Sequence, residues 1–229
     1  MLQKKPFMNK VFLYSSYFIF VLFGFNAYAE GENTVSIGKF SEWGLEEWES
    51  VEFNDETSYR LKDESDNPKL KVLHAISQAS ASGMFKKMKV NIQKTPFLNW
   101  RWKVNKPLAS LPEETKQGDD YAARIYVVVS DGWFFWQTKA LNYVWSSRED
   151  APASWPNAYA PDNTLMIPLR NNSDGAGQWH IEKRNIQEDL KAWLGKSYDE
   201  VEAIAIMTDA DDSGSNAEAE YGDIFFSER

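Results

Sequence analysis

The sequence contains no cysteine and only two histidines among its 229 residues. Disulfide bonds and lipid attachment through an N-terminal cysteine are therefore excluded, and a conventional zinc site is not expected. The sequence also has no G-x-S-x-G nucleophile elbow, no P-loop and no glycine-rich dinucleotide fingerprint. These absences remove the commonest motifs of hydrolases and nucleotide-dependent enzymes, so no organic cofactor is expected.

Basic residues are fewer than acidic residues. The chain has 25 lysines and arginines against 34 acids, which gives a formal net charge of -9. An acidic surface repels phosphate backbones, so nucleic acid is not an expected partner. Neutral sugars, cations and basic partners remain compatible with this charge.

The longest apolar run lies near the N-terminus. Residues 1–10 carry three lysines and no acid, and residues 11–25 are almost wholly apolar. That run is short for a membrane helix, which needs about 20 residues. Small residues at Ala27 and Ala29 fit a signal-peptidase site. The pattern predicts a signal peptide over 1–29 and a single domain over 30–229, periplasmic or secreted, with no stable membrane insertion after cleavage. The alternative is an uncleaved anchor.

Helical periodicity is scarce, whereas short β-rich runs separated by turn residues are frequent. One good helix is predicted over 186–194, ended by Gly195. The fold class predicted is therefore all-β: an antiparallel two-sheet sandwich with one short helix, of the jelly-roll type found in carbohydrate-binding modules. Strands are expected at 34–40, 48–53, 58–61, 70–76, 97–104, 121–130, 133–136, 141–145, 165–169, 179–185, 203–208 and 221–226, and the segment 83–92 is ambiguous.

Arg124 lies inside the most regular of these strands, between apolar neighbours. A cation in such a strand needs a partner on a neighbouring strand or in a ligand. Asp120 is on the same face but about 13 Å along the strand, too far to pair directly. Arg124 is therefore a candidate ligand-binding residue, and a structural ion pair is the alternative.

The sequence is rich in tryptophan, with ten in all. Flat aromatic rings mixed with amides suit a sugar site, because rings stack on sugar faces and amides form paired hydrogen bonds. Asn142, Trp145 and Trp155 are candidates on this ground, with Asn157 and Tyr159 beyond them. The alternative is that these tryptophans form the core of the sandwich.

A further set of candidates lies in the strand 179–185. Glu182 and Arg184 share a face with His180 and are candidate ligand-binding residues. A catalytic carboxylate at Glu182 is conceivable, but acids are abundant throughout the chain. No catalytic residue is assigned.

The segment 209–220 resembles the twelve-residue calcium loop in its spacing of oxygen ligands. Calcium needs six to eight oxygens from a tightly curled backbone. Acids or other oxygens fall at the required positions, with Gly214 at the turn. The predicted metal ligands are Asp209, Asp211, Ser213, Ser215 and Glu220. The alternative is an acidic, solvated hairpin turn.

Several motifs, taken in order, resemble the exported bacterial proteins grouped as domain of unknown function 3047. They are LNWRWK at 98–103, GDDYAARIYV at 118–127, LNYVW at 141–145, AIMTDAD at 205–211 and YGDI at 221–224. The resemblance spans roughly 83–226 and implies an exported bacterial protein. It implies no activity, and no catalytic residue is carried over. Glu220 is not part of the family's usual pattern.

Three functions follow as hypotheses. The leading one is an exported β-sandwich protein that binds carbohydrate or cell-envelope polysaccharide. The second is a glycan-active hydrolase or lyase that uses Asp120, Arg124 and Glu182. The third is a structural or interaction protein of the cell envelope. A concave site would favour the first two over the third.

Overall fold

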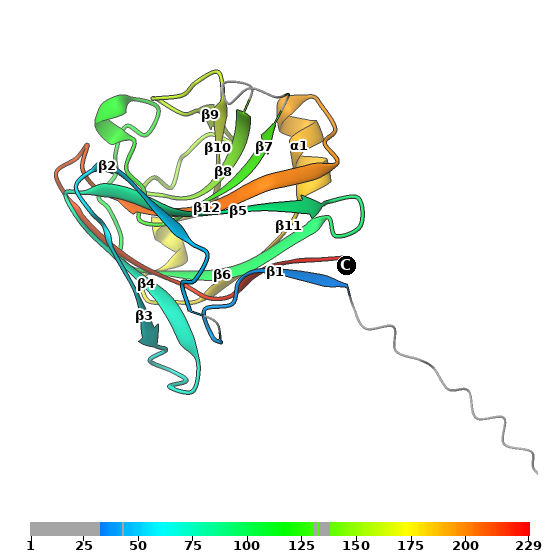
Figure 1. Cartoon of the computed structure of the whole chain (residues 1–229). Helices are drawn as coiled ribbons and strands as arrows, with labels where there is room; N and C mark the ends of the chain where they lie inside the picture. The colour runs from blue at the N-terminus through cyan, green and yellow to red at the C-terminus, as the bar shows by residue number, and fades with distance from the viewer. Residues whose placement is uncertain (1–32, 43, 131, 133–137) are drawn as a thin grey trace, which may run out of the picture. The chain divides into compact units, whose positions relative to one another are not determined.

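The computed structural model describes residues 33–42, 44–130, 132 and 138–229. The predicted signal peptide and the strand predicted at 133–136 lie outside these residues. Within them, no helix is long and apolar enough to cross a membrane. The described residues form two β-sheets packed face to face (Figure 1).

The first sheet, sheet A, has seven strands, one of which, β11, lies off the main path and pairs with β6. The pairings of its strands are antiparallel throughout. In spatial order the strands are β1 (Thr34–Gly38), β14 (Ile224–Ser227), β6 (Phe97–Lys106), β13 (Asn216–Tyr221), β4 (Lys71–Gln78) and β3 (Ser58–Asp63), with β11 (His180–Asn185) beside β6.

The second sheet, sheet B, also has seven strands. Its pairings are antiparallel except that β10 runs parallel to β8. In spatial order the strands are β2 (Glu49–Asn54), β5 (Ala81–Asn91), β12 (Glu200–Asp209), β7 (Arg124–Ser130), β8 (Thr138–Ser146), β10 (Thr164–Asn171) and β9 (Trp155–Pro156).

The connection between the sheets is that of a jelly roll. Consecutive strands β4 and β5 lie in opposite sheets, and so do β12 and β13. The two pairs run side by side, because β13 pairs with β4 in sheet A and β12 pairs with β5 in sheet B. The β4–β5 and β12–β13 segments therefore lie side by side and extend across both sheets, as paired segments do in a jelly roll. The prediction of an all-β, two-sheet jelly roll with one helix is confirmed.

The core lies between the sheets and is dominated by aromatic residues. Alternate residues of β6 face inward, and Trp100 and Trp102 are buried there. The ring of Trp100 stacks on that of Tyr143 with centroids 5.5 Å apart, and Trp102 meets Trp145 edge-on at 6.1 Å. Offset and edge-on ring pairs stabilise a core beyond the area they bury.

The one α-helix in the described part of the chain, α1 (Ile186–Leu194), occupies the predicted residues. The side chain of Asn185 accepts the backbone N–H of Glu188 and caps its N-terminus, while Gly195 ends it with φ 69°. Ile186 and Leu190 are buried and hold the helix against the sheets. Two short 3-10 turns are also present, η1 (Lys116–Gly118) and η3 (Asn172–Asp174).

Several strand limits differ from the prediction. The ambiguous segment 83–92 belongs mostly to β5, and the strand predicted from residue 121 begins at Arg124. The predicted loop 209–220 is not one loop, because β12 runs through Asp209 and β13 begins at Asn216. The inward side chains of β13 include Ala217 and Ala219, which are too small to give a strong hydrophobic signal.

Candidate functional site

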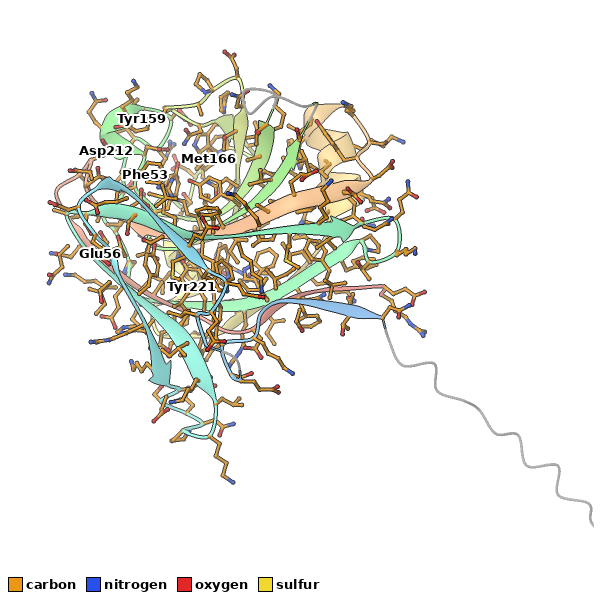
Figure 2. The ribbon with its side chains drawn as sticks, in the orientation of Figure 1. Phe53, Glu56, Tyr159, Met166, Asp212 and Tyr221 are labelled. Carbon is orange, nitrogen blue, oxygen red and sulfur yellow. The ribbon has the colours of Figure 1, made fainter. Side chains whose placement is uncertain are left out.

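A pocket of about 450 Å³ opens on the outer face of sheet B. Such a volume lies in the range usual for small-ligand sites. Figure 2 shows Phe53, Tyr159 and Asp212 gathered at this end of the molecule. The residues that line it are Phe53, Asn54, Ala81, Asp119, Arg124, Tyr126, Asn157, Tyr159, Ala160, Thr164, Met207, Asp209, Asp211 and Asp212.

Strand alternation sends the floor residues outward. In β7, Ile125 and Val127 point into the core, so Arg124 and Tyr126 face the pocket. The neighbouring strand β12 alternates in the same way and presents Met207 and Asp209. Met207 is directly opposite Arg124 in the strand register. Asp209 is two residues further along β12 and lies on the same face, within reach of the Arg124 guanidinium.

Arg124 is only 2% exposed and its guanidinium carries the positive charge of the pocket floor. Its Nη2 donates to the carboxylate of Asp209. Its guanidinium lies 5.0 Å from the ring centre of Tyr121 and 5.7 Å from that of Tyr126, within cation–π range. The other two nitrogens, Nη1 and Nε, have no hydrogen-bond partner among the described residues. Arg124 is thus held in place and retains unused donors.

Asp119 stands on the opposite side of the guanidinium. Its Oδ2 lies 3.9 Å from Arg124 Nη1, which is too long for a hydrogen bond. Asn157 Nδ2 donates to both carboxylate oxygens, at 2.9 and 3.0 Å, and fixes their orientation. The backbone of the preceding residue, Gly118, packs closely against Pro112, because a Cβ on Gly118 would lie only 2.6 Å from the Pro112 carbonyl. This close packing positions the segment that carries Asp119.

Burial governs the acids of the floor. It raises the pKa of Asp119, and the Arg124 charge and the hydrogen bonds from Asn157 only partly oppose that rise. It also raises the pKa of Asp209, against the opposing effect of Arg124. Both carboxyl groups therefore hold a proton more readily than an exposed aspartate does.

The mouth of the pocket combines exposed rings with acids. Phe53 of β2 is 68% exposed and Tyr159 is 55% exposed, which is unusual for rings of this size. Asn54 Nδ2 donates to Asp211 at 3.0 Å, and the hydroxyl of Tyr159 donates to Asp212 at 2.5 Å. These two bonds join both rims to the turn between β12 and β13.

The two aspartates of that turn, Asp211 and Asp212, form a cluster with Asp120, which precedes β7. One oxygen each of Asp120, Asp211 and Asp212 lies within 4.8 Å of the others. Asp120 is buried and accepts the backbone N–H groups of Asp212 and Ser213, at 3.2 and 2.7 Å. Gly214 completes the turn with φ 63°, a conformation that favours glycine.

The predicted calcium loop does not close as expected. Glu220 lies in β13 and is paired with Lys103 and Lys62, at 2.7 and 2.9 Å, so it is not a neighbour of the cluster's acids. Asp209 is engaged by Arg124, and the carbonyl of Ser215 accepts the N–H of Ala79 at 2.8 Å. The structure brings Asp211 together with Asp120 and Asp212 instead. Calcium binding remains a prediction, and its remaining candidate ligands are these three carboxylates and Ser213, whose Oγ has no hydrogen-bond partner among the described residues.

The predicted set of aromatic and amide residues is brought together only in part. Asn157 and Tyr159 line the pocket. Trp145 is in the core, edge-on to Trp102 and to His180 at 5.2 Å. Trp155 is 4% exposed and donates to the hydroxyl of Tyr121 at 3.3 Å. Asn142 is buried, with its Nδ2 3.4 Å from Met166 Sδ. Trp145, Trp155 and Asn142 are not among the residues that line the pocket.

Glu182 and Arg184 have structural partners in and around β11. Glu182 accepts from Trp102 Nε1 at 3.1 Å and from Arg170 Nε at 2.7 Å. Arg184 forms a two-bond ion pair with Asp189, at 2.8 and 2.5 Å. Neither residue lines the pocket, so among the six predicted ligand-binding residues only Arg124 does.

Tyr159 and Asp211 of the mouth were candidates from the sequence, whereas Phe53, Asn54 and the floor residue Asp119 were not. Phe53 follows Val51 with one residue between them in a short strand that otherwise carries polar residues, and every residue of β2 is exposed. This pattern could have pointed to an apolar surface, although it did not indicate what lay opposite. Asp119 lies in the GDDYAAR motif, but its role depends on Asn157, 38 residues away.

Comparisons with known structures reveal distant likenesses. A family 11 carbohydrate-binding module from Clostridium thermocellum is 10% identical, with 84% of this chain and 94% of that chain covered and a TM-score of 0.45. A carbohydrate esterase from Shiga toxin-encoding bacteriophage phi24B is 11% identical, with coverages of 86% and 99% and a TM-score of 0.45. An adhesin domain of Lys-gingipain from Porphyromonas gingivalis is 9% identical, with coverages of 85% and 97% and a TM-score of 0.41.

These likenesses are too distant to carry an argument about a ligand. No curated protein matches the sequence. The family model described as "Protein of unknown function (DUF3047)" matches residues 46–225, which is most of the chain and agrees with the resemblance found in its motifs. The chain belongs to the DUF3047 family.

Proposed function

We propose that this chain is an exported protein that binds carbohydrate in the pocket on sheet B. The observation that carries the proposal is the 3.9 Å separation between Arg124 Nη1 and Asp119 Oδ2. The nitrogen is a buried donor without a hydrogen-bond partner among the described residues, and the oxygen is an acceptor. They are too far apart to satisfy each other and close enough to share a third group.

A hydroxyl group fits this gap better than a charged group. A hydroxyl can accept from Arg124 and donate to Asp119 at the same time. A ligand carboxylate could accept but not donate, and it would face Asp119 and Asp209. An ammonium could donate but would leave Arg124 unsatisfied. The floor therefore favours an alcohol, and sugars are the common ligands that present several.

The rims support the same proposal. Phe53 and Tyr159 offer exposed ring surface on either side of a polar floor. Aromatic faces cover the apolar C–H faces of a sugar while the floor bonds its hydroxyls. Export is supported by the basic, apolar and small-residue pattern of residues 1–29.

The test is a glycan array, followed by calorimetry, with cell-wall and exopolysaccharide material included. Phe53→Ala and Tyr159→Ala should each weaken binding by about two- to tenfold, since a stacked ring contributes about 0.5–1.5 kcal/mol. Ile181→Ala is the matched control, because Ile181 is 77% exposed and does not line this pocket. Failure of every glycan to bind, or equal effects of all three variants, would overturn the proposal.

A glycan-active enzyme is the second candidate. Burial raises the pKa of Asp119, and a raised pKa is what a general acid needs. The site first expected, with Glu182 beside Arg124, is not assembled, so Asp119 is the residue to test. Incubation with the bound oligosaccharide separates the candidates: intact ligand after prolonged incubation supports binding alone, and products lost in Asp119→Asn support catalysis.

A further inference from the structure

The acids of the pocket differ in how their charge is balanced. Four aspartates and one arginine line the pocket. Arg124 lies between Asp209 and Asp119 and offsets charge on the floor. Asp211 and Asp212 at the mouth instead have the neutral donors described above, and the Asp120 carboxylate lies beside them. The negative charge is therefore concentrated at the mouth.

The surroundings of Asp212 agree with this distribution. Its carboxylate has one oxygen within 4.8 Å of an oxygen of Asp211 and of an oxygen of Asp120. A carboxylate among carboxylates favours a nearby cation. The rim also accommodates a cation on its aromatic side, since Lys116 Nζ lies 4.9 Å from the centre of the Tyr159 ring.

An acidic cluster alone does not identify a ligand. The independent evidence is Arg124, which is 2% exposed, lines the same pocket and has two nitrogens, Nε and Nη1, without a hydrogen-bond partner among the described residues. The pocket therefore offers a hydroxyl site at its floor and a cation site at its mouth. A ligand that fills both carries hydroxyl groups at one end and a positive charge at the other.

We infer that the preferred ligand is an amino sugar with a free, protonated amine, and this inference rests on the carbohydrate binding proposed above. A sugar hydroxyl bridges Arg124 and Asp119, while the ammonium group donates to Asp211 and Asp212. An N-acetylated sugar lacks the positive charge and loses the second interaction. A uronic acid brings a negative charge to a mouth that repels it.

The experiment compares four tetrasaccharides by calorimetry in the presence of chelator: chitosan tetramer, chitin tetramer, cellotetraose and tetragalacturonate. At mildly acidic pH the chitosan amines are protonated. We expect chitosan tetramer to bind about tenfold more tightly than chitin tetramer, as a charge-assisted hydrogen bond of roughly 1.5–3 kcal/mol allows. Tetragalacturonate should bind most weakly of the four.

Matched variants locate the effect. The double variant Asp211→Asn/Asp212→Asn should remove the preference for chitosan over chitin while retaining cellotetraose binding. The control is Asp66→Asn/Glu228→Gln, which makes the same change in net charge at two exposed positions that do not line the pocket. An equal loss in both double variants would mean a general attraction to an acidic protein and would overturn the inference.

The two proposals fail in different ways. If cellotetraose or chitin tetramer binds and chitosan tetramer binds no more tightly, the amine preference is wrong and carbohydrate binding stands. If tetragalacturonate binds most tightly, the charge argument is wrong. If none of these or of the arrayed glycans binds, carbohydrate binding itself is wrong.

Discussion

Arg124 and Asp119 face each other across 3.9 Å without forming a hydrogen bond, while Asp209 holds the guanidinium from another side. This arrangement affects both the stability of the fold and the recognition of a ligand. The bond to Asp209 anchors the arginine, and the gap to Asp119 leaves donor and acceptor groups for a ligand.

Replacing Arg124 should affect both properties. Arg124→Met leaves Asp209 buried beside no cation, and breaking a buried pair costs about 3–5 kcal/mol. We expect that loss in the free energy of unfolding, measured with denaturant, together with loss of glycan binding. The double variant Arg124→Met/Asp209→Leu should lose less stability, because the carboxylate bonded to the missing guanidinium is removed with it, and still fail to bind. A loss of under roughly 1 kcal/mol in the single variant would contradict the buried pair.

Asp119→Asn should separate stability from binding. Because the native pKa of Asp119 is raised, its stabilising contribution is present below the unfolded-state pKa and is lost as the pH rises through the native pKa. An asparagine at this position carries no charge, so the variant does not lose this stability as the pH rises. At neutral pH the variant should therefore unfold at a higher temperature than the original protein. The difference should vanish below pH 3.8, the ordinary value for the group. Glycan affinity should fall about tenfold with the charged acceptor gone.

Glu220 should show the opposite pH dependence. Burial alone would raise its pKa, but hydrogen bonds from Lys103, Lys62 and Asn105 outweigh burial and lower it. Its contribution is therefore present above the unfolded-state pKa and lost as the pH falls through the native pKa. Glu220→Gln should cost about 3 kcal/mol at pH 7, because Lys103 is left buried and unpaired. The deficit should shrink at pH 3 in denaturant titrations, whereas Glu228→Gln should change little at either pH.

The calcium prediction can be tested by melting. An ion at 100 times its dissociation constant stabilises a fold by about 2.7 kcal/mol, a shift of roughly 5–10 °C for a domain of this size. Metal-free protein should melt higher in millimolar calcium and lower again in chelator. Asp211→Asn should abolish the difference and Glu220→Gln should not. An unchanged melting temperature would show an ordinary acidic turn. Calcium should also weaken chitosan binding, because both would occupy the same oxygens.

Export predicts a processed N-terminus. Protein isolated from its native host should begin at Glu30, as cleavage after Ala29 requires. Intact-mass spectrometry of envelope and medium fractions gives the result directly. Recovery of chains that retain residues 1–29 would favour the uncleaved anchor.

The strands and the helix whose local sequence pattern is strong could be predicted from the sequence. Alternation in β6 and the spacing and caps of α1 were sufficient because each pattern lies within one element. The strand β13 was missed because Ala217 and Ala219 bury so little apolar surface, and because its acids are balanced by lysines on distant strands. The loss of Glu220 from the predicted metal site follows from the same long-range pairing.

The site was less predictable than the fold. Arg124 was found because a cation in an apolar strand requires a partner wherever the strand lies. Trp145 was predicted to lie in a sugar site, and Phe53 was not a candidate. The sequence shows that each ring is present, but the packing of other strands determines whether the ring is buried or exposed. Glu182 was misjudged because Arg170 reaches it from another strand.

Among the described strands, β2 pairs with β5 alone, at the edge of sheet B (Figure 1). Every one of its residues is exposed, yet it supplies Phe53 and Asn54 to the pocket. An edge strand with so little burial opens at a low free energy, well below that of global unfolding. Its backbone amides should therefore exchange with solvent sooner than those of the central strand β12. Occupation of the pocket would slow that exchange, so β2 can report binding without any label on the ligand.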